Sequence, residues 1–126
     1  MQTTSNKHLS NEYQSWQNAL GFYKDELGVY KNRLTEVAGK NTAQETLQQV
    51  EHFQNQFLIQ IESIDTLSHD IKIHLSEMAG TMQEHAGHVS QEQLATQAQL
   101  KERYETENKI FADLKVEFTQ FLSKVM

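Results

Sequence analysis

Histidines are the residues of this sequence with the clearest potential for chemistry. Five of the six fall between residues 52 and 88: His52, His69, His74, His85 and His88. The densest group is Glu84-His85-Ala86-Gly87-His88. Its two imidazoles, three residues apart, would share one face of a helix and could chelate a divalent metal ion. A third ligand would have to come from a nearby carboxylate such as Glu84 or Glu92.

Two surface histidines at a helix end would explain the same spacing without a metal. The Glu-x-x-His motif that di-iron bundles carry on two helices is absent, as is His-Glu-x-x-His, and no cysteine can supply a thiolate. We therefore predict no metal site and no cofactor. Glu84, His85 and His88 remain the candidates for an alternative function, a helical bundle that binds a metal or a small ligand.

Two aspartate–histidine pairs are spaced four residues apart, Asp65 with His69 and Asp70 with His74. Such pairs support a helix when the imidazole is charged. A catalytic pair would also need a nucleophile in a pocket. Ser68 is predicted to bond the backbone of its own helix instead. We expect no catalytic residues and no enzymatic activity.

Composition excludes several other classes of protein. The chain has 126 residues, no proline and a formal net charge of −6. An acidic chain is a poor neutraliser of nucleic-acid phosphates, and no apolar run approaches the roughly 20 residues that span a bilayer. The N-terminus has no hydrophobic signal region. We therefore predict a cytoplasmic protein with a single domain over residues 1–126, of which residues 1–5 are flexible.

Apolar residues recur at alternating steps of three and four along the whole chain, which predicts three long, coiled-coil-like helices over residues 6–38, 42–86 and 90–124. Gly39 marks the end of the first, Thr42 with Glu45 the start of the second, and Ser90 with Gln93 a capping box for the third. Whether the second continues through Gly80 stays open. Short connections predict an antiparallel, up-down-up, all-α three-helix bundle.

Helix lengths predict how the bundle ends are aligned. At 1.5 Å per residue the second helix would be about 67 Å long and the first about 48 Å. Asn6 should then lie beside residue 74. Helices two and three would extend past helix one as a tip over residues 75 to about 100.

Several polar residues fall at predicted core positions: Gln54, Ser68, His85, Gln93, Gln97 and Glu107. A buried polar group of this kind commonly fixes helix register. For Glu107 two outcomes stay open. Its carboxylate is either buried between Tyr104 and Phe111 or reaches out to solvent.

The negative charge is concentrated in the second helix, where residues 41–90 contain seven carboxylates against Lys72 alone. Five histidines in the same segment would offset most of this charge on protonation, so pH sensing is one hypothesis.

Apolar residues outside the seams predict an interface. The candidates outside the seams are Phe22, Val29, Ile59 and Ile73, and Met78 and Met82, from the seam at the predicted tip, are added to them. The leading prediction is a non-enzymatic interaction or structural module that forms a homodimer, with a helical protein partner as a further option and with no nucleic-acid or membrane insertion role.

Overall fold

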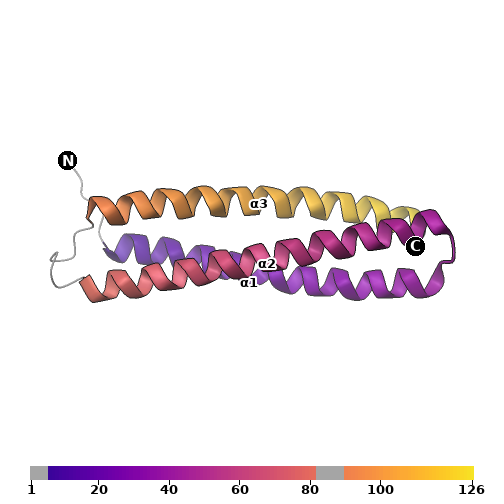
Figure 1. Cartoon of the computed structure of the whole chain (residues 1–126), viewed down its shortest axis with the longest axis horizontal. Coiled ribbons are helices and arrows are strands. Elements are labelled where there is room, and N and C mark those ends of the chain that lie inside the picture. The colour runs from indigo at the N-terminus through magenta and orange to yellow at the C-terminus, as the bar shows by residue number, and fades with distance from the viewer. Residues whose placement is uncertain (1–5, 82–89) are drawn as a thin grey trace.

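Three long helices make up the described part of the chain. The computed structural model describes residues 6–81 and 90–126, and these form α1 (Asn6–Lys40), α2 (Gln44–Thr81) and α3 (Gln91–Val125), with no strand among them. The helices run up, down and up (Figure 1). The predicted all-α antiparallel three-helix bundle is confirmed. The predictions for residues 1–5 and for a helix over residues 82–86 lie outside the described residues.

Side-chain hydrogen bonds cap the start of α3 and the end of α1. Ser90 and Gln93 form the predicted capping box at the start of α3, with both hydrogen bonds at 3.1 Å. At the end of α1 the helix continues through Gly39. The Asn41 side chain then donates to the backbone oxygen of Val37 at 2.9 Å, so an asparagine satisfies this terminal carbonyl. α2 is helical through Gly80 as far as Thr81.

Aromatic pairs hold α1 against α3 and show that these two helices are parallel. Trp16 stacks on Tyr104 with ring centroids 5.3 Å apart, and Tyr23 stacks on Phe111 at 4.3 Å. One heptad further, Tyr30 packs on Phe118 at 5.0 Å. Each step adds seven residues on both helices, so the α1–α3 contact follows the heptad repeat.

α2 is rotated relative to the prediction. The heptad column through Val50, Ile64 and Ile71 is buried as expected. The second column of the core is Phe53, Gln60, Leu67 and His74. The predicted column was Gln54, Ile61, Ser68 and Leu75. Gln54 is exposed, and the other three are only partly buried. Phe53 and Leu67 bury more apolar area than Gln54 and Ser68 do. Gln60 and His74 are buried as well, because they belong to the same heptad column as Phe53 and Leu67.

The ends of the three helices are more nearly level than the sequence predicted. Tyr13, not Asn6, lies beside His74, with ring centroids 5.5 Å apart, and Gln97 of α3 donates to Glu12 of α1 at 2.6 Å. α1 therefore covers most of the segment expected to be a two-helix tip. In Figure 1 α2 and α3 reach only slightly beyond the start of α1. The prediction was wrong by about one heptad of register.

Candidate functional site

Three hollows lie along the groove between α2 and α3. Their volumes are about 380, 260 and 250 Å³. The first is lined by residues including His52 and Lys124, the second by Ser63, Glu107 and Ile110, and the third by residues including Ile73 and His74. The surface of the bundle between α2 and α3 is therefore hollowed at three places along its length.

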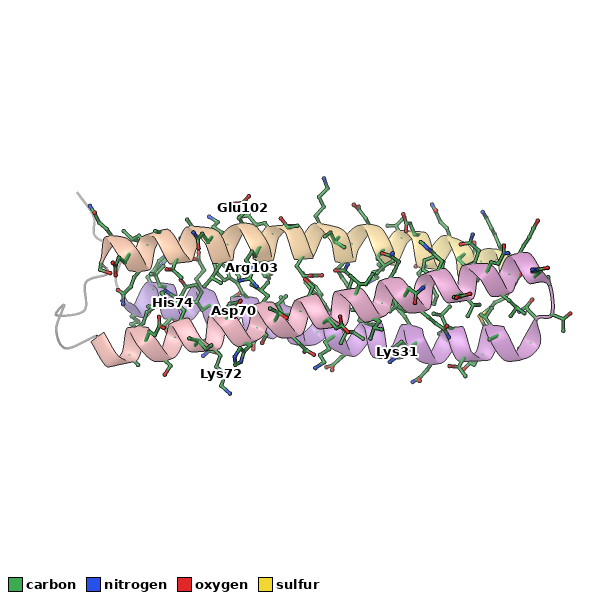
Figure 2. The ribbon with its side chains drawn as sticks, viewed as in Figure 1. Lys31, Asp70, Lys72, His74, Glu102 and Arg103 are labelled. Atoms are coloured by element: carbon green, nitrogen blue, oxygen red, sulfur yellow. The ribbon has the colours of Figure 1, made fainter. Side chains whose placement is uncertain are left out.

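An ion pair bridges the groove between α2 and α3. Arg103 of α3 donates to Asp70 of α2 at 2.8 Å, and Figure 2 shows both side chains in the space between the two helices. Lys72, two residues after Asp70, points outward from α2 in the same view. The predicted partnership of Asp70 with His74 is replaced by this contact. Asp65, the other predicted histidine partner, pairs with Lys24 of α1 at 2.7 Å.

His74 forms the floor of the third hollow. Its side chain is 5% exposed, and its Nε2 atom has no hydrogen-bond partner among the described residues. The buried hydroxyl of Tyr13 has none either, and the two rings meet edge to face. Burial lowers the pKa of His74, against a smaller opposing effect of Glu77, whose carboxylate lies 3.8 Å from Nδ1. Burial also raises the pKa of Tyr13. Both side chains are therefore held in their neutral forms.

A second polar layer surrounds Glu107. This carboxylate is 3% exposed, so of the two outcomes left open by the sequence the buried one is confirmed. The Gln60 amide, oriented to donate, lies 2.6 Å from Glu107 Oε2, and Ser63 also hydrogen-bonds the carboxylate. Burial raises the pKa of Glu107, while the bond from Ser63 acts in the opposite direction. The buried carboxylate therefore has donors from α2, which is what a buried polar group needs to be tolerated.

Ser68 contributes a third polar contact, between α1 and α2. Its hydroxyl donates to Gln17 Oε1 at 2.6 Å, and Gln17 Nε2 donates back to the backbone oxygen of Ser68 at 2.9 Å. The prediction that Ser68 bonds the backbone of its own helix was wrong. Its hydroxyl is already committed to a reciprocal contact between helices, which leaves it poorly placed to serve as a nucleophile.

The described residues contain no metal-ligand cluster. Nowhere in residues 6–81 and 90–126 do three His, Asp or Glu side chains converge as a metal ion requires. The candidates Glu84, His85 and His88 lie outside the described residues, so the alternative of a metal site there stays a prediction. No helix in the described ranges is long and apolar enough to cross a membrane.

The predicted interface residues fall on separate surfaces. Ile59 and Ile73 are 52% and 45% exposed on α2. Phe22 and Val29 are more than half exposed on α1, on the same side as Glu26, which pairs with Lys115 of α3. They border the α1–α3 side of the bundle, away from the two isoleucines.

The remaining interface candidates are the two methionines. Met78 is 3% exposed and belongs to the core of the bundle, so its side chain is not available on the surface. Met82 lies outside the described residues.

Sequence reasoning missed two buried polar residues, Gln60 and His74. The signal that could have found them is the spacing of Phe53 and Leu67, which are 14 residues apart in one heptad column with Gln60 midway and His74 next. The partner of Asp70, by contrast, depends on how α3 is placed beside α2, and no spacing within one helix reports that.

Comparison with known proteins gives this chain no relative: no family model, no curated protein and no solved structure matches it.

Proposed function

We propose that this protein is a non-enzymatic interaction module that self-associates as a homodimer through the outer face of α2. The observation that carries the proposal is the exposure of Ile59 and Ile73, two large apolar side chains on one side of this helix. Fully burying such a side chain is worth about 1.5–3 kcal/mol, and about half of that remains to be gained here because each isoleucine is already partly covered. A second copy of the chain would gain that free energy from both partners, and two-fold dimers are the commonest assemblies.

The polar groups beside this face support an interaction role over a catalytic one. Asp70 is paired with Arg103, and Glu107 is bonded by Ser63 and Gln60. An active site needs a general acid, base or nucleophile that faces a substrate. Here Asp70 and Arg103 face each other and Glu107 faces donors of α2, as groups that fix helix packing do. The proposal includes the cytoplasm as the compartment, which imaging of the tagged chain would test.

Light scattering tests the proposal directly. We expect the purified chain at tens of micromolar to show twice its 14.6 kDa monomer mass. Ile73→Glu should weaken the dimer at least tenfold, because it places a charge in an apolar contact. The matched control is Val116→Glu, which alters a similarly exposed residue on α3. A monomer mass for the unmodified chain, with a normal helical circular dichroism spectrum, overturns the proposal.

A further inference from the structure

The outer face of α2 has a symmetric arrangement of side chains. Five exposed residues follow steps of three and four along one stripe: Ile59, Glu62, Thr66, His69 and Ile73. The two isoleucines lie at the ends, the acidic and the basic residue lie inside them, and Thr66 is at the centre. We call these five residues the α2 stripe. It covers 14 residue steps, or about 21 Å of helix.

Residues at steps of three and four form a seam that a second helix can cover. The core seam of α2 is already covered by α1 and α3. The α2 stripe lies on a different side of the helix, and its members are exposed. Thr66, at its centre, bonds the backbone oxygen of Glu62, one turn earlier, at 3.0 Å. The stripe is therefore a second, unpartnered seam on the same helix.

We propose that the α2 stripes of two copies pack against each other antiparallel, around a two-fold axis at Thr66. This inference rests on the self-association proposed above and specifies its geometry. The axis would set Ile59 of each copy against Ile73 of the second copy. It would also bring Glu62 of each copy within one residue step of His69 of the second copy, once on either side of the axis. Thr66 would meet its own counterpart.

The charges of the stripe select the antiparallel direction. A parallel pair of stripes would place Glu62 beside Glu62, and like charges that face each other destabilise a helix pair. In the antiparallel pair each carboxylate faces an imidazole instead. Both isoleucines of each copy are paired only if the register is centred at Thr66, because a shift of one heptad would place Thr66 against an isoleucine and leave the other isoleucines unpaired.

A cysteine at the axis is the sharpest test, because the chain has no other cysteine. In Thr66→Cys the two thiols would face each other, so mild oxidation should convert most of the protein into a disulfide-linked dimer. The matched control is Thr35→Cys. Thr35 is an exposed threonine on α1 whose hydroxyl makes the same bond to the backbone one turn earlier. The control should cross-link only at the background level of random collision.

A charge exchange tests the register by a separate measurement. His69→Glu would place two carboxylates together on either side of the two-fold axis and should weaken the dimer about threefold to tenfold. Adding Glu62→Lys to this variant restores opposite charges and should restore most of the affinity. Sedimentation equilibrium of the three proteins measures the change.

The outcomes separate this inference from the proposal beneath it. If the unmodified chain is a dimer but Thr66→Cys cross-links no better than Thr35→Cys, the antiparallel α2 contact is wrong while self-association stands. A dimer that is unchanged by His69→Glu also overturns the inferred register. A monomeric unmodified chain overturns both.

Discussion

His74 and Glu107 are ionisable side chains of the bundle interior, and burial disfavours the charged form of each. His74 and Glu107 are buried at different levels of the core, and burial moves their pKa values in opposite directions, down for the imidazole and up for the carboxyl. Both shifts have the same cause, because loss of hydration in the protein interior disfavours the charged form of either group. Glu107 is compensated by donors from Ser63 and Gln60. The Nε2 atom of His74 has no comparable partner among the described residues.

The burial of His74 predicts how the stability of the protein depends on pH. Because the pKa of His74 is lower in the folded state than in the unfolded state, the unfolded chain binds the proton first as the pH falls below about 6.5. Through His74 the stability should therefore decrease from pH 7 to pH 5, while Glu107, whose pKa is raised by burial, acts in the opposite direction. His74→Leu should remove this contribution, and at pH 7 it should be as stable as the unmodified chain or more stable by about 1–3 kcal/mol, the usual cost of an unsatisfied buried polar atom.

Urea titrations of both proteins at pH 7, 6 and 5 measure this, at one fixed protein concentration because a dimer links stability to concentration. The prediction fails if His74→Leu loses as much stability between pH 7 and pH 5 as the unmodified chain does. That result would assign the acid sensitivity to other groups.

At the scale of the helices, the sequence predicts the elements well and their rotations less well. The seam of α1 from Leu9 to Val37 and the Ser90 cap follow from spacing and residue type alone, since both are local properties. α2 has two overlapping seams that share Val50 and Ile64. The choice between Phe53 with Leu67 and Ile61 with Leu75 is made by packing against two neighbours, which a single helical pattern does not contain.

Contacts between helices were beyond the reach of the sequence for the same reason. The aspartate–histidine spacing on α2 is compatible with pairs inside the helix. A lysine on α1 and an arginine on α3 lie closer and bind Asp65 and Asp70 instead. The bond between Ser68 and Gln17 joins residues 51 positions apart. Such partners depend on the register of one helix against another. The register predicted from the helix lengths was wrong by about one heptad.

The cap of α3 is the element-scale feature most open to measurement. Ser90 accepts from the backbone of Gln93, and the Gln93 side chain accepts from the backbone of Ser90. Ser90→Ala leaves a backbone donor of the first turn without its partner and should destabilise the protein by about 1 kcal/mol.

The matched control is Ser123→Ala, at the opposite end of α3. The hydroxyl of Ser123 bonds the backbone oxygen of Gln120, and its loss should change the stability by less than about 0.5 kcal/mol. Urea midpoints at a fixed concentration measure both variants. Equal effects at the two serines would show that the cap is not a stabilising contact.

Across the whole molecule, one core connects the two ends of the bundle. It runs from Leu9 and Met78 at one end to Val37, Val50 and Phe121 at the other, with buried residues at every heptad between. Side chains packed this closely transmit the loss of a contact to their neighbours. A chain of 126 residues with one continuous core is expected to unfold as one unit.

The single tryptophan makes this expectation testable. Trp16 packs on Tyr104 and Tyr13, far along α1 from Val37. Val37→Ala deletes buried apolar volume beside the α1–α2 turn and should lower the stability by about 1–3 kcal/mol. If the bundle is one cooperative domain, the urea midpoint followed by Trp16 fluorescence shifts by the same amount as the midpoint followed by helical circular dichroism. A Trp16 transition that stays in place while the circular dichroism transition moves would instead divide the molecule into two units, one at each end. Aromatic pairs join α1 to α3 at every heptad from Trp16 with Tyr104 to Tyr30 with Phe118. This continuous series of contacts through the middle of the bundle argues for the common shift.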